Sequence, residues 1–80
     1  FCIPHLADDD YVRRFALLVK KLLRPDLNIY LEYSNETWNP MFRQTRYCRE
    51  QGMKMGLARD ETRAGLRFAA LRSVQIFHIW

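Results

Sequence analysis

One amphipathic helix between two short apolar runs constrains the fold of this chain most strongly. Over residues 9–23 apolar side chains recur at intervals of three and four, which predicts a helix with one buried stripe. The stripe comprises Val12, Phe15, Ala16, Val19, Leu22 and Leu23. Asp8, Asp9 and Asp10 provide an N-cap and negative charge for the first turn. The helix is expected to end before Pro25, because proline disfavours helical backbone in the residue before it.

Short strands are predicted on both sides of that helix. Residues 1–4 are an apolar run that ends in proline, which is typical of the last residues of a strand. Residues 27–33 form the second predicted strand, in which Ile29, Leu31 and Tyr33 share one face. A strand–helix–strand order implies two parallel strands joined by a right-handed crossover. The predicted fold class is therefore α/β.

Two further helices are predicted after the second strand, which makes about three helices in all. Asn39 and Pro40 are a cap followed by proline at the first helical position, a strong start signal. The apolar stripe of this helix comprises Met41, Thr45, Cys48, Gly52 and Met55. Gly56 is its predicted C-terminal cap, and Asp60 begins a last helix that continues to the end of the chain. Without an internal repeat or linker, residues 1–80 are expected to form a single structural unit.

The two predicted strands are too few to complete a fold. Parallel strands are normally covered on both faces, and this chain alone cannot provide enough layers. A chain of this size buries only about 60–65% of its unfolded surface, so it has little stability in reserve. Phe1 and Trp80 look like neither a natural start nor a natural stop. We therefore expect the chain to be a piece of a larger fold.

The composition excludes several classes of protein. The chain is 49% hydrophobic and 28% charged, which argues against disorder. No run of about 18 apolar residues occurs, so no membrane-spanning helix is expected. The formal net charge is +4, but acidic residues interrupt the basic ones and no long single-sign block forms. Solvated helix faces explain this pattern, and nucleic acid and membranes are not the expected partners.

The cysteines and histidines do not indicate a metal site. Cys2 and Cys48 are the only cysteines, too few for a disulfide scaffold. Cys2 lies three residues from His5, but only Cys48 and His78 remain as further thiol or imidazole ligands. We expect inert thiols, no bound metal and no cofactor.

The densest polar chemistry lies in residues 34–39, directly after the second predicted strand. Ligands of α/β proteins bind at the carboxyl ends of strands, so a functional site is expected here. If no bulge interrupts the strand, Glu32, Ser34 and Glu36 point to the same side, with Glu32 deeper and buried. His5 lies in the equivalent loop after the first strand and is expected to face the same cleft.

Residues 30–39, with the sequence YLEYSNETWN, resemble a motif of known enzymes. This string is similar to the Asn-Glu motif that ends the fourth strand of retaining (β/α)8-barrel glycoside hydrolases. More narrowly, it resembles a group with the pattern EYSNE-x-WN that is described as cellulose-binding or cellulase-like. Residues 4–8 and 72–73 also resemble that group, so the resemblance covers nearly the whole chain. It implies a fragment of a TIM barrel, from the end of strand three through the helices after strand four.

The resemblance also implies roles for single residues. Glu36 would be the general acid/base, and Asn35 would hydrogen-bond the sugar 2-hydroxyl. Trp38 would stack on a sugar ring or pack beside the strand end, and His5 and Asn39 complete the candidate substrate-binding set. The nucleophile of such enzymes comes from the seventh strand, which this chain lacks. The chain would therefore carry half of the catalytic pair and be inactive alone.

Three hypotheses for function stay open at this stage. The first is a glycoside hydrolase domain that acts on β-linked polysaccharide and whose barrel is completed by further chain. The second is a non-catalytic carbohydrate-binding barrel, and the third is a small basic helical module that binds nucleic acid or protein. Polysaccharide or oligosaccharide is the expected partner. The compartment is left open, with secretion of the intact parent as one option.

Overall fold

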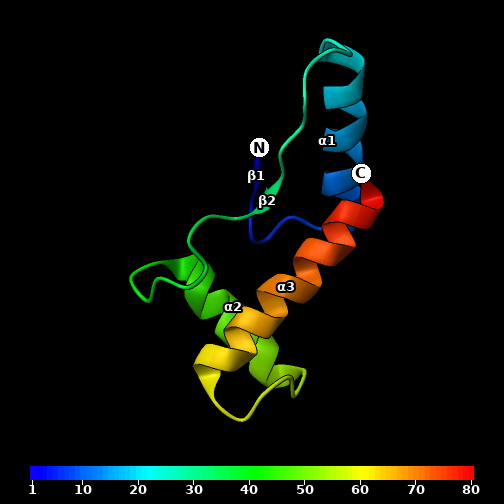
Figure 1. The fold of residues 1–80 in the computed structure, drawn as a ribbon. Coiled ribbons are helices and arrows are strands. Elements are labelled where there is room, and N and C mark those ends of the chain that lie inside the picture. Colours follow the sequence, from blue (N-terminus) through cyan, green and yellow to red (C-terminus); the bar gives the residue numbers. More distant parts are fainter.

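The computed structural model describes residues 1–80 and contains two short strands and three helices (Figure 1). In chain order these are β1 (Cys2–Ile3), α1 (Asp9–Leu22), β2 (Glu32–Tyr33), α2 (Arg43–Lys54) and α3 (Glu61–Ile79). The molecule is elongated, with principal extents of 43 × 22 × 16 Å. No helix is long and apolar enough to cross a membrane.

The strand–helix–strand prediction is confirmed. β1 and β2 pair in parallel, with Cys2 opposite Glu32 and Ile3 opposite Tyr33. Helix α1 connects them, and its N-cap is Asp8, whose side chain accepts a hydrogen bond from the Tyr11 backbone N–H at 2.8 Å. The chain is thus a small α/β unit.

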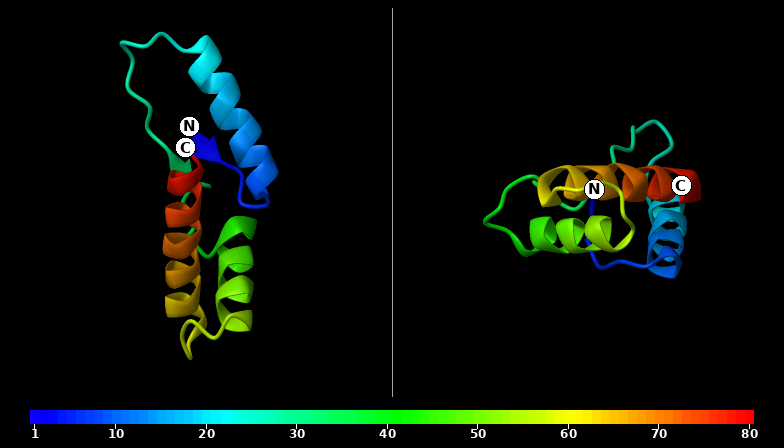
Figure 2. Two further views of the ribbon diagram at one scale, coloured as in Figure 1. Left: turned by 90° about the vertical axis from the view of Figure 1, so that its right-hand side faces the viewer. Right: turned by 90° about the horizontal axis from the view of Figure 1, so that it is seen from below.

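The second strand is shorter than the predicted range of residues 27–33. Only Glu32 and Tyr33 are paired, and residues 27–30 are an exposed connection (Figure 2). The physical reason is the lack of a partner. Phe1 lies beside Tyr30 and Glu32, because its amino group donates to the Tyr30 carbonyl and its carbonyl accepts from the Glu32 N–H at 3.0 Å, whereas residues 27–29 have no backbone paired with them.

Helix α2 begins at Arg43, three residues later than the predicted start at Pro40. Asn39 caps a tight turn in place of the helix, because its Oδ1 accepts from the Met41 N–H at 3.0 Å. Met41 is consequently 85% exposed and lies outside the stripe that the periodicity predicts. Thr45, Cys48 and Gly52 of that stripe are buried as predicted.

Helices α2 and α3 lie side by side as a helical hairpin (Figure 2). The predicted cap at Gly56 is confirmed: its φ is +67°, and the N–H groups of Gly56 and Leu57 donate to the carbonyls of Met53 and Gly52. Asp60 caps α3 as predicted, accepting from the Arg63 N–H at 2.9 Å. The two helix ends are therefore set by contacts within a few residues of each end.

The core lies where α3 covers the two strands and the start of α1. Its buried members are Ile3, Val12, Tyr33, Cys48, Phe68 and Ile76. The rings of Tyr33 and Phe68 meet edge to face at 6.3 Å. Many large apolar side chains stay outside this core, among them Leu6, Leu17, Leu22 and Tyr30.

Candidate functional site

The loop after β2 bends sharply away from the strand direction. Ser34 and Glu36 have positive φ angles of 56° and 45°, in the left-handed region that non-glycine residues rarely adopt. The Ser34 N–H still donates to the Ile3 carbonyl at 2.6 Å, so the turn begins immediately after the paired residues. A rare backbone conformation at two nearby residues means that the surrounding contacts hold this loop in shape.

This bend breaks the side-chain alternation on which the sequence interpretation depended. Glu32 is exposed, Ser34 is 7% exposed and Glu36 is half-buried. The expectation of a buried, partnered Glu32 is wrong. Its carboxylate has one partner, the Cys2 thiol, whose Sγ lies 3.7 Å from Oε2 at the surface. The left-handed backbone at Ser34 is the physical reason why strand parity does not extend to Glu36.

Glu36 is held by the residues that follow it. Its Oε2 accepts a hydrogen bond from Asn39 Nδ2 at 3.2 Å, and its carbonyl accepts from the Asn39 N–H at 2.9 Å. The Thr45 hydroxyl, on the first turn of α2, lies within hydrogen-bond distance of the carbonyls of Glu36 and Asn39. Because Thr45 is only 2% exposed, this contact anchors the loop to α2.

The side chains of the three remaining candidates in the loop, Asn35, Trp38 and Asn39, differ in how accessible they are to a ligand. Both ends of the Asn39 carboxamide are engaged within the loop, by Glu36 and by the Met41 N–H. Asn35 is exposed, and its carbonyl accepts from Gln44 Nε2 at 2.8 Å, so its carboxamide is open to solvent. Trp38 is 63% exposed, which makes its indole face accessible to a ligand.

His5 lies in a different cleft from the loop. Its half-buried ring is 5.3 Å from the ring of Tyr47, and the cleft of about 630 Å³ also contains Arg72 and Gln51. Tyr47 and Thr45 are two positions apart on α2, which places them about 200° apart around the helix axis. The structure therefore brings Asn35, Glu36, Trp38 and Asn39 into one loop and leaves His5 on the other side of α2.

Arg72 ties the loop after β1 to α3. Its side chain is 12% exposed, and its guanidinium donates to Asp9 Oδ1 at 2.6 Å and to the Ala7 carbonyl at 3.0 Å. Periodicity did not identify Tyr47 or Arg72 as residues of the His5 cleft. Their position depends on how α2 and α3 pack, and no local sequence signal reports that.

The Tyr33 phenol lies in the core, next to Cys48 and Phe68. Burial raises its pKa, and the neighbouring Cys48 thiol raises the pKa further. Burial likewise raises the pKa of Cys48. The neutral Tyr33 hydroxyl donates to the His5 carbonyl at 3.0 Å, so it positions the loop after β1.

Comparisons with known proteins add no relative. No family model, no curated protein and no solved structure matches the chain. Within the molecule, no three His, Cys, Asp or Glu side chains are grouped so that they could hold a metal ion. The functional interpretation consequently starts from the loop of residues 34–39 and its resemblance to a glycosidase motif.

Proposed function

We propose that this chain is part of a (β/α)8-barrel domain that acts on polysaccharide as a retaining glycoside hydrolase, with Glu36 as the general acid/base. The position of Glu36 carries the proposal. It lies in the loop directly after β2, at the carboxyl end of a parallel strand pair, where α/β proteins bind their ligands. Its carboxylate is half-buried and oriented by Asn39.

Unpaired backbone and exposed apolar side chains before β2 support the barrel part of the proposal. Residues 27–29 belong to a stretch with the side chains of a strand but lack a strand beside them. Leu27, Ile29 and Tyr30 are exposed in this segment. Neighbouring barrel strands and helices would cover both the unpaired backbone and these side chains.

The chemistry needs a second carboxylate from elsewhere in the barrel, about 5–5.5 Å from Glu36. That carboxylate attacks the anomeric carbon while protonated Glu36 gives its proton to the departing glycosidic oxygen. Glu36, now ionised, takes a proton from water as that water releases the sugar from the enzyme. Asn35 and Trp38, the two exposed loop side chains, are placed to contact the sugar by a hydrogen bond and by stacking.

The test is Glu36→Gln in the full-length domain that contains this chain. The amide keeps the shape of the side chain but has no transferable proton, so turnover of unactivated β-linked oligosaccharide should fall by about 10²–10⁴-fold. Binding of the oligosaccharide should survive, and the loss should be smallest for substrates with activated leaving groups. Steady-state kinetics on both substrate types checks this.

Glu32→Gln, measured beside it, is the matched control, because it makes the same change on β2, outside the loop that holds Glu36. Full turnover by Glu36→Gln on unactivated substrate would refute the assignment. A parent domain that binds oligosaccharide but never cleaves it would instead favour the non-catalytic carbohydrate-binding barrel.

A further inference from the structure

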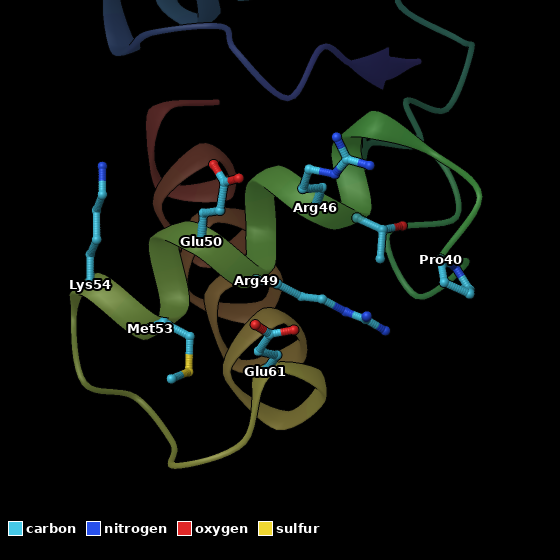
Figure 3. A pocket seen from close by; sticks show the side chains of 8 residues that line it. Pro40, Arg46, Arg49, Glu50, Met53, Lys54 and Glu61 are labelled. Atoms are coloured by element: carbon cyan, nitrogen blue, oxygen red, sulfur yellow. The ribbon is translucent and has the colours of Figure 1, made fainter.

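A cavity of about 640 Å³ lies between α2 and the start of α3, next to the loop of residues 34–42 (Figure 3). This volume is in the range of sites for small ligands. Charged side chains dominate its lining, and Figure 3 shows them extending from α2 and from the first residue of α3. They are Arg46, Arg49, Lys54, Glu50 and Glu61.

The cations of this cavity have no anionic partner in the chain. The four ion pairs of the molecule involve Arg14, Arg24, Arg63 and Arg72, so Arg46, Arg49 and Lys54 take part in none. Arg49 matters most because it is half-buried: its stem passes over Gly65 of α3, where no side chain stands in the way. A partly desolvated guanidinium without a partner favours an added anion.

Arg49 also connects this cavity to Trp38. A second, smaller cavity of about 50 Å³ is lined by Arg49, Trp38 and Thr37. The exposed Trp38, in the loop that holds Glu36, therefore lies beside the Arg49 side chain. An aromatic face, a guanidinium and free carboxylates form a set that suits an acidic sugar.

We propose that this cavity binds a hexuronic acid unit of an acidic polysaccharide. Arg49 and Arg46 hold the sugar carboxylate, Glu50 and Glu61 accept hydrogen bonds from its hydroxyls, and Trp38 packs against the neighbouring ring. This inference rests on the proposed function and names the substrate class of a subsite next to the loop that holds Glu36. The charge distribution agrees, because residues 40–80 contain eight of the 13 basic residues and only three of the nine acidic ones.

The test compares two trimers that differ only in their carboxylates: cellotriose and the β-1,4-linked glucuronic acid trimer. Titration calorimetry with the full-length domain that contains this chain should show the acidic trimer binding at least about tenfold more tightly at low salt. Arg49→Gln should weaken binding of the acidic trimer by about 10–100-fold and leave cellotriose unaffected. Arg46→Gln, at an exposed position, should show the same selective loss.

Arg13→Gln on α1 is the control, since it removes the same charge from an exposed residue outside the cavity. Circular dichroism checks that each variant keeps its helices. If Arg49→Gln unfolds, the affinity of Arg46→Gln for the two trimers tests the inference instead. Equal affinity for the two trimers, or no binding of either, would overturn the uronate inference, whereas the Glu36 proposal is judged separately by turnover. Tight, salt-sensitive binding of duplex DNA that Arg13→Gln and Arg49→Gln weaken equally would also overturn it, in favour of a nucleic-acid surface.

Discussion

Single hydrogen bonds within the loop of residues 34–42 decide which side chains can meet a ligand. Both ends of the Asn39 carboxamide form hydrogen bonds within the loop, and one of these bonds orients the Glu36 carboxylate. Asn35 and Trp38 make no such side-chain bonds and remain open to solvent. The resemblance suggested a similar role for all three, and the structure separates them into one positioning residue and two accessible ones.

Glu32 and Glu36 offer a direct comparison at this scale. Glu32 is exposed, and a long contact to the Cys2 thiol is its only partner. Glu32→Gln should therefore change the free energy of unfolding of this chain by no more than about 0.5 kcal/mol. Urea unfolding followed by circular dichroism measures it, and a loss of about 2 kcal/mol would mean that Glu32 has a buried partner after all.

The buried Tyr33 phenol makes the free energy of unfolding depend on pH in the alkaline range. Burial raises the pKa of its phenol above the ordinary value of 10.0. The unfolded chain then releases this proton near pH 10 while the folded chain keeps it, so the free energy of unfolding falls as the pH rises through that range. At pH values below the pKa of the Tyr33 phenol in the unfolded chain, the stabilising contribution of this phenol is fully present. Cys48, whose pKa is also raised from 9.0, adds to the same loss.

Tyr33→Phe should reduce this alkaline slope. The variant loses the hydrogen bond to the His5 carbonyl, which should cost about 1 kcal/mol at pH 7. Above pH 10 the difference from the parent chain should narrow, because the phenylalanine has no proton to release. Urea unfolding at pH 7, 9 and 10.5 checks this. A difference in the free energy of unfolding between the two chains that stays constant over these pH values would contradict it.

At the scale of elements, the α2–α3 hairpin depends on one glycine. A Cβ atom on Gly52 would lie 2.1 Å from the Ala64 carbonyl oxygen, which is backbone and cannot swing aside. Gly52→Ala should therefore destabilise the chain by about 2–3 kcal/mol, even though alanine is the better helix former. Thermal melting by circular dichroism measures the loss.

Gly56→Ala is the matched comparison, because it adds the same methyl group where nothing lies within 4 Å. Only its left-handed backbone opposes the change, at a cost of about 1–2 kcal/mol. A Gly52→Ala variant as stable as the parent chain would mean that α2 and α3 do not pack as closely as described.

Elements with local causes were predictable from the sequence. The caps at Asp8, Asp60 and Gly56 each depend on side chains or backbone within a few residues. The length of β2 was not predictable, because a strand needs a partner and residues 27–29 have no backbone paired with them. The start of α2 was missed since an Asn-Pro pair fits a helix cap and a tight turn equally well.

At the scale of the whole molecule, tertiary packing determines features that local sequence patterns could not predict. The cleft of His5 forms because Tyr47 of α2 and Arg72 of α3 come together beside the loop after β1. The left-handed turn at Ser34 likewise has no local signature, since neither glycine nor asparagine stands there. Candidate residues of the loop could be predicted from the motif, but their separation from His5 could not.

The 80-residue chain by itself should be inactive on glycosides. One carboxylate of the retaining pair is present in the proposal, and without the second no glycosyl-enzyme intermediate forms. Incubation with chromogenic β-glycosides and with β-glucan should release no product above a Glu36→Gln control. Cleavage by the purified chain that Glu36→Gln abolishes would show that the whole catalytic apparatus lies within these residues.

The pairing of Cys2 with Glu32 also has a consequence for how the chain folds. The two residues are 30 positions apart, so the parallel pair must close a long loop before any of its contacts form. The α2–α3 hairpin needs only a short connection and forms its contacts locally. We expect the hairpin to fold first and to offer Phe68 and Ile76 as a surface on which the strands then meet. The two strands would therefore pair only after the α2–α3 hairpin has formed.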